Sequence, residues 1–75
     1  MGEVKKSVEF GEKAVLLNPE SAIFCANLSI YYHKDNQYDK RNQLFEKAED
    51  LDYDDMQSLK DAYALSSDSL EKVNE

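Results

Sequence analysis

The chain matches itself after a shift of 34 residues, from position 12 to position 46. The segment EKAVLLNPE at 12–20 lies over EKAEDLDYD at 46–54. The identical pairs in this overlay are Glu12 and Glu46, Lys13 and Lys47, Ala14 and Ala48, and Leu17 and Leu51. A period of this length is typical of a unit built from two helices joined by a turn, so we expect repeated helical hairpins.

The composition agrees with a small helical domain. The 75 residues form one domain at most, and 41% hydrophobic, 33% charged and 11% aromatic residues fit a folded chain better than a disordered one. Two glycines and one proline leave few sites for the tight turns of a small β fold. We therefore predict an all-α protein.

A first helix is predicted over residues 4–17, where apolar residues recur mostly every three or four positions. These apolar residues are Val4, Val8, Phe10, Ala14, Val15, Leu16 and Leu17. Asn18 ends the helix because a residue before proline is pushed out of the helical region. Pro19 is expected to open the next helix, at a position where its missing N–H costs nothing.

Further helices follow at regular intervals. The expected ranges are about 20–34, 38–51 and 56–65, with a polar turn at 35–37 and a turn or new N-cap at 66–69. The acidic run 49–55 is unfavourable at a helix C-terminus and favourable at an N-terminus. We therefore expect one helix to end near Leu51 and the next to begin near Asp54. Leu70 and Val73 are expected in a frayed fifth helix.

The segment 22–55 carries the residues that suggest a family. Those at the family's spacing are Leu28, Tyr32, Tyr38, Phe45 and Ala48, with Pro19 at the boundary before them. On these residues and the 34-residue period, the chain resembles the tetratricopeptide repeat family. The departures are Ser29 for the usual glycine, Arg41 for an alanine, Cys25 where tryptophan is common and Tyr53 for the second boundary proline.

The resemblance implies an α-solenoid of antiparallel helix-turn-helix repeats, with about four helices in a single domain over residues 1–75. Its parts would be helix B of a partial repeat at 2–17, a complete repeat at 20–52, helix A of a further repeat at 54–66, and a turn with a frayed end at 67–75. In such arrays the A helices line a concave groove.

By the same resemblance, helix A of the complete repeat has a packing face and a groove face. The packing face is Cys25, Leu28, Ser29 and Tyr32. The peptide-binding groove would be lined by Ile23, Ala26, Asn27, Ile30, His33, Lys34, Gln57, Lys60, Asp61 and Ala64. This mixed apolar and polar strip suits an extended or helical peptide. The alternative is that Ile23 and Ile30 belong to the core.

One branch of the family grips the C-terminal carboxylate of heat-shock chaperones with Lys, Arg and Asn in the groove. Asn27 stands at the matching asparagine position. The following repeat has Gln57 and Asp61 where lysine and arginine would be needed, and an aspartate there repels a carboxylate ligand. We therefore do not expect this kind of clamp.

The sequence offers no convincing catalytic or metal site, so we expect neither an enzyme nor a cofactor. His33 is the single histidine, and a surface position near a helix C-terminus is its ordinary explanation. Cys25 is expected to be buried and inert. The acidic residues from Asp50 to Asp61 imitate the spacing of a calcium loop, but Asp55 stands where the loop needs glycine. A solvated turn between repeats is the preferred interpretation of that run.

The net charge of −7 is unevenly distributed. Residues 1–17 hold three acids and three bases, residues 18–48 hold four of each, and residues 49–75 hold nine acids and two bases. The lack of a basic surface argues against nucleic acid as a partner. The acidic end could attract a basic partner or simply aid solubility. Without a long apolar run we expect no membrane association, and we expect a reducing, cytoplasmic location.

Two functions remain after these exclusions. The first is a protein-protein interaction module that binds a peptide or protein segment in the groove. The second is a structural segment that packs within a larger repeat protein or self-associates, as a homodimer through the uncovered first helix. Val4, Val8, Phe10 and Leu17 motivate the second, because no preceding helix covers them. A free-standing four-helix bundle would have equally short loops.

Overall fold

The computed structural model describes residues 2–66, and the expected fifth helix at Leu70 and Val73 lies outside them. The described chain is all-α. Its four helices are α1 (Gly2–Leu17), α2 (Ala22–Lys34), α3 (Tyr38–Asp50) and α4 (Met56–Ser66). Within a residue or two these are the helices predicted from the apolar spacing.

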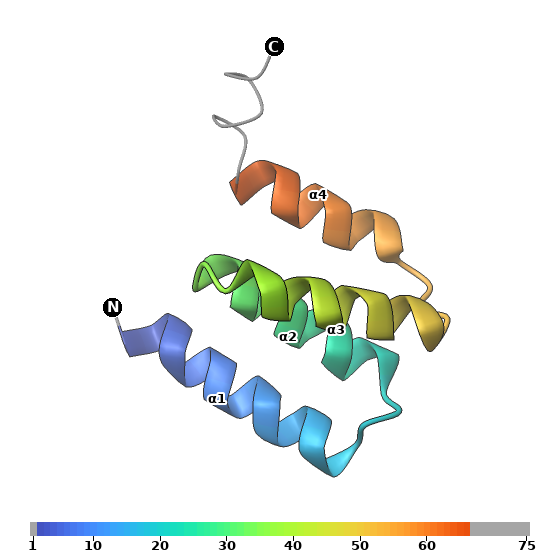
Figure 1. Ribbon diagram of the computed structural model, residues 1–75, viewed down its shortest axis with the longest axis horizontal. Helices are drawn as coiled ribbons and strands as arrows, with labels where there is room; N and C mark the ends of the chain where they lie inside the picture. The colour runs from blue at the N-terminus through green and yellow to red at the C-terminus, as the bar shows by residue number, and fades with distance from the viewer. Residues whose placement is uncertain (1, 67–75) are drawn as a thin grey trace.

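The helices form a compact stack in which α2 packs against all three others. In Figure 1, α1 and α4 lie at opposite edges, with α2 and α3 between them. The helices α3 and α4 also touch, whereas α1 makes no backbone contact with α4 in the described chain. The two edge helices therefore have faces that no other described helix covers.

The start of α2 differs from the prediction. Pro19 lies in the turn and does not open the helix, which begins at Ala22. Ser21 is the N-cap, and its hydroxyl accepts a hydrogen bond from the Phe24 amide at 3.3 Å. A serine cap satisfies an amide that would otherwise lack a partner at the helix start, which proline at the first position cannot do.

The helices α2 and α3 end in the same way. Behind α2, the amide of Gln37 donates to the carbonyl of Tyr32 and that of Asn36 donates to His33, a Schellman pattern. Behind α3, the amide of Tyr53 donates to the carbonyl of Ala48, and the amide of Asp52 donates to the carbonyl of Glu49, which is the same pattern. Asn36 and Asp52 have φ of 63° and 62°, a conformation that Asn and Asp adopt at lower cost than most residues.

The acidic run is divided as expected, between the end of α3 and the start of α4. The helix α3 ends at Asp50, and α4 begins at Met56, two residues after the expected Asp54. Asp55 precedes α4 and accepts hydrogen bonds from the amide and hydroxyl of Ser58 at 3.3 and 2.7 Å. Negative charge at this end also suits the helix dipole.

The core lies on both sides of α2, and the predicted packing face of α2 is confirmed. Cys25 and Ser29 are 0% exposed, Leu28 is 3% exposed and Tyr32 is 5% exposed. One buried cluster joins Cys25 and Ala26 to Ala48 of α3 and Leu59 of α4, and a second joins Leu28 and Tyr32 to Val8 of α1. The expectation that Val8 is uncovered is wrong, because α2 buries it to 6% exposure.

Candidate protein-binding surface

The residues predicted to line a groove on α2 and α4 fall into three classes. Ile23, Asn27, Lys34, Gln57, Lys60 and Asp61 are exposed, Ile30 and Ala64 are half-buried, and Ala26 and His33 are buried. Ile30 packs against the core cluster of Ala26 and its neighbours. Ile23, in contrast, is 59% exposed. A surface formed by this set therefore consists of its six exposed members, without Ala26 and His33.

His33 is a core residue, so the expectation of a surface histidine is wrong. It is 4% exposed, and its ring lies 4.9 Å from that of Tyr63 on α4 and 5.4 Å from that of Tyr38 on α3. Arg41 Nη1 lies 2.9 Å from His33 Nδ1. Because a guanidinium has only donors, it donates this bond to an unprotonated Nδ1.

The charge state of His33 follows from these surroundings. Burial and the Arg41 charge lower the pKa of His33, while a hydrogen bond with the Tyr63 backbone partly offsets them. The Arg41 guanidinium also lies 5.0 Å from the centre of the Tyr38 ring and 4.9 Å from that of Tyr63. His33, Arg41 and the two tyrosines thus join α2, α3 and α4 at one end, a structural role.

A second polar contact connects α2 to α4. The Tyr63 hydroxyl donates to Ser29 Oγ at 2.6 Å, and the Ser29 hydroxyl donates to the Ala26 carbonyl at 2.7 Å. Burial raises the pKa of Tyr63, so the phenol stays protonated and able to donate. The Ser29 hydroxyl therefore gives the Tyr63 hydroxyl its partner.

An apolar groove runs between α1 and α2. It encloses about 460 Å³ and is lined by Phe10, Gly11, Lys13, Ala14, Leu17, Asn18, Phe24, Asn27 and Tyr31. Phe10 is 73% exposed and Leu17 is 78% exposed. Lys13 is the one charged residue of this lining. The α1–α2 groove adjoins the predicted strip through Asn27, and a neighbouring hollow includes Lys34.

Gly11 allows the two helices to approach closely beneath this groove. A Cβ added at Gly11 would lie 2.9 Å from Leu28 Cδ1 and 3.1 Å from Tyr31 Cδ2. Gly11 is buried, although it lies in the middle of α1. A glycine in a helix interior costs helix stability, so close packing is the physical reason for its presence here.

The 34-residue overlay shows what the groove residues of α1 would do if they were covered. Phe10, Gly11, Ala14 and Leu17 correspond to Leu44, Phe45, Ala48 and Leu51 of α3. On α3, Ala48 is 0% exposed and the other three pack against the core cluster. Two of these register positions are therefore packed on α3 and exposed on α1, because Phe10 and Leu17 are exposed where Leu44 and Leu51 pack against the core.

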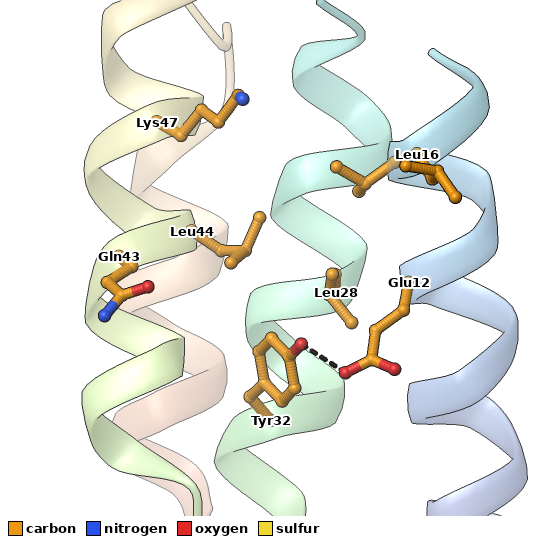
Figure 2. Close-up of a pocket in the computed structure, with 8 residues that line it drawn as sticks. Glu12, Leu16, Leu28, Tyr32, Gln43, Leu44 and Lys47 are labelled. Carbon is orange, nitrogen blue, oxygen red and sulfur yellow. Dashed lines mark hydrogen bonds between the residues drawn. The ribbon is translucent and has the colours of Figure 1, made fainter. Parts of the chain in front are cut away.

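A third hollow lies on the other side of α1, between α1, α2 and α3. Figure 2 shows Glu12, Leu28, Tyr32, Leu44 and Lys47 around it. The Tyr32 hydroxyl donates to Glu12 Oε2 at 2.6 Å. Burial and the Glu12 carboxylate raise the pKa of Tyr32. These two polar side chains are part of the lining, and the hollow offers a ligand less apolar surface than the α1–α2 groove does.

Chemistry-bearing groups are scattered over the described chain. Residues 2–66 bring together no group of three or more His, Cys, Asp or Glu side chains that could hold a metal ion. Cys25 is fully buried, and burial raises the pKa of its thiol, which makes it a poor nucleophile. Among these residues, none of the helices is both long and apolar enough to cross a bilayer.

The sequence predicted a binding groove on the A helices, α2 and α4, and this prediction did not include the α1–α2 groove. The 34-residue overlay does indicate this groove, because Phe10 and Leu17 align with Leu44 and Leu51, which pack against the core on α3. Comparison with protein-family models, with curated proteins and with solved structures yields no match for this chain.

Proposed function

We propose that this chain is a tetratricopeptide-like scaffold that binds a segment of another protein. The observation that carries the proposal is the uncovered apolar groove between α1 and α2, where Phe10 and Leu17 are 73% and 78% exposed, and Ile23 of α2, outside the groove lining, is also 59% exposed. Exposed apolar side chains that border one groove mark sites of protein association in soluble domains. The 34-residue period and the paired helix ends support the repeat assignment.

The binding surface would extend from this groove across α2 to α4. Asn27 lines the groove on α2, Ile23 is an exposed residue of the same helix, and Lys60 and Asp61 would continue the exposed strip on α4. Asp61 is held by Gln57, whose Nε2 donates to Asp61 Oδ1 at 3.0 Å. Apolar contact beside charges of both signs suits a peptide with an apolar anchor and a polar flank.

The second candidate is a structural role through self-association. The exposure of Phe10 and Leu17 favours it as well, because a copy of the same chain would bury them equally. In that case the chain has no separate peptide ligand.

The test of the first candidate compares Ile23→Ser with Leu16→Ser. Both remove an exposed aliphatic side chain, but Leu16 lines the hollow on the other side of α1. A purified binding partner, identified by retention on the immobilised full chain, should bind the Ile23→Ser variant at least about tenfold more weakly. Leu16→Ser should bind as the unaltered chain does.

Circular dichroism must show that both variants keep the helical content of the unaltered chain. Equal partner affinity for the two variants would contradict the proposed surface. A chain that retains no protein under any condition would contradict the binding function itself.

A further inference from the structure

His33 is buried where α2, α3 and α4 meet, and its ring is bonded to both of the other helices. Arg41 Nη1 of α3 lies 2.9 Å from Nδ1 and donates to it. A neutral imidazole has one donor and one acceptor nitrogen, so its proton is then on Nε2. The backbone of Tyr63 on α4 also forms a hydrogen bond with this ring. The neutral form of His33 therefore connects α3 and α4 to α2.

Protonation of His33 conflicts with this arrangement. An imidazolium has a donor at each nitrogen, so Nδ1 would no longer accept the bond from Arg41. Two positive charges would then lie side by side in a site where His33 is 4% exposed and water screens them little.

The other groups around His33 do not supply a compensating negative charge. Titratable and charged side chains face it from both helices that pack against it, namely Tyr38 and Arg41 of α3 and Tyr63 of α4. Asp35 stands two positions further along the chain, but its carboxylate accepts from Gln37 at 2.6 Å and pairs with Lys5 at 3.4 Å. The charge that His33 meets in this cluster is therefore the positive one of Arg41.

The helix that this conflict would release is α4. It lies at an edge of the stack in Figure 1, and of its side chains from Met56 to Ala64, Leu59 alone is buried. The helices α2 and α3 share a larger core, in which Leu44 packs beside Leu28 and Ala48 beside Ala26. Local opening occurs first where the fewest apolar contacts are buried, so α4 opens at lower cost than the α2–α3 pair.

Release of α4 would uncover an apolar surface of α2 and α3. Leu59 of α4 shares a buried cluster with Cys25, Ala26 and Ala48, against which Ile30 also packs. Ala26 and His33 are the two predicted groove residues that the structure buries. The opened form would therefore expose the strip of α2 that the sequence predicts as a binding surface.

We propose that His33 is an acid-sensitive switch, whose protonation releases α4 from α2 and α3 and opens the apolar surface beneath it. The switch acts whether or not a partner occupies the α1–α2 groove.

The direction of the pH dependence follows from the difference between the docked and released forms. The pKa of His33 is lowered from 6.5 when α4 is docked, mainly by burial and then by the charge of Arg41. Once α4 is released the ring faces water, and its pKa returns towards 6.5. The docked form is therefore fully favoured above about pH 6.5, and this advantage is lost as the pH falls through the docked pKa.

Hydrogen exchange of backbone amides tests the switch on the full chain. Protection factors, which correct for the direct effect of pH on exchange, are compared for each helix at about pH 7 and about pH 5. Those of α4 should fall by at least about tenfold at the lower pH, because the docked form loses the hydrogen bond from a charged donor. Those of α1, α2 and α3 should fall less. Binding of the dye ANS should rise together with the opening of α4, since this dye reports exposed apolar surface.

His33→Gln is the matched control. A glutamine side chain offers Arg41 an oxygen acceptor and Tyr63 an amide donor, and it does not titrate. The protection of α4 in this variant should be the same at both pH values. Arg41→Gln is a second variant, which keeps a donor for Nδ1 without the charge. The ratio between its two α4 protection factors should be smaller than in the unaltered chain.

An unchanged protection of α4 between the two pH values overturns the proposal. An equal fall in all four helices also overturns it, because the whole chain would then be unfolding. A fall of the same size in His33→Gln would assign the effect to carboxylates instead. If His33→Gln does not fold, a pH dependence in Arg41→Gln as large as that of the unaltered chain rejects the charge conflict on which the switch depends.

Discussion

Replacing Gly11 by alanine measures how tightly α1 is held against α2. The added methyl group would lie 2.9 Å from Leu28 Cδ1, which is closer than two carbon atoms approach unless one of them moves. Alanine in a helix interior is more favourable than glycine by about 1 kcal/mol. Overpacking a close contact costs about 1–3 kcal/mol. We expect Gly11→Ala to destabilise the protein by up to about 2 kcal/mol.

Leu28→Ala supplies the second half of a double-mutant cycle. Alone it should cost about 2–5 kcal/mol, because it empties the cluster shared by Leu28, Val8 and Tyr32. In that background the contact of 2.9 Å is gone, and the methyl at position 11 still lies 3.1 Å from Cδ2 of Tyr31, a half-buried side chain that lines the groove. Gly11→Ala should then stabilise by about 1 kcal/mol, which gives a favourable coupling of about 1–3 kcal/mol.

Urea unfolding followed by circular dichroism provides the four free energies of this cycle. A chain of 75 residues has about 4–11 kcal/mol of stability, so each of these changes is measurable. If Gly11→Ala is as stable as the unaltered chain and shows no coupling to Leu28→Ala, then α1 is not packed closely on α2. The role of glycine at this position would then be refuted.

The remaining predictions concern the polar contacts and the acidic turn. The pKa of His33 is lower in the folded chain than its usual 6.5, so its contribution to stability is complete above about pH 6.5 and is lost as the pH falls through the folded pKa. Unfolding free energies at about pH 7 and pH 5 should differ more in the unaltered chain than in His33→Gln, and equal differences would contradict this. Tyr63→Phe removes the donor to Ser29 and should cost about 1 kcal/mol in urea unfolding, whereas no loss would mean that solvent serves Ser29 equally well. Adding calcium should leave the melting temperature unchanged, and a cooperative rise would establish the site that Asp55 argues against.

The helices could be predicted closely from the sequence because the signals that make them are local. The spacing of apolar residues, the Asn18-Pro19 pair and the acidic turn act within a few residues along the chain. The packing face of α2 was predictable for a similar reason, since Leu28 and Tyr32 stand at regular helical intervals. The start of α2 was predicted less well, because Ser21 and Pro19 are both plausible start signals.

The site was harder to predict, because burial depends on residues that lie far away in the sequence. His33 is buried by Arg41 and by Tyr63, which lies 30 residues further along the chain. Ala26 is buried for a similar reason, because Leu59 of α4 belongs to the same buried cluster. The residues of α3 and α4 that bury His33 and Ala26 cannot be recognised from the sequence of α2, so His33 and Ala26 were both predicted to line the groove.

The sequence by itself determined that this chain forms helical hairpins, since helix formation depends on neighbours within a turn. It also determined the register that relates α1 to α3. Only the tertiary structure decided that Ala48 is enclosed while Ala14 borders an open groove, and that Phe10 and Leu17 remain exposed. The physical reason is that identical positions become core or surface according to which helix packs over them: α3 packs against both α2 and α4, whereas α1 packs against α2 alone among the described helices.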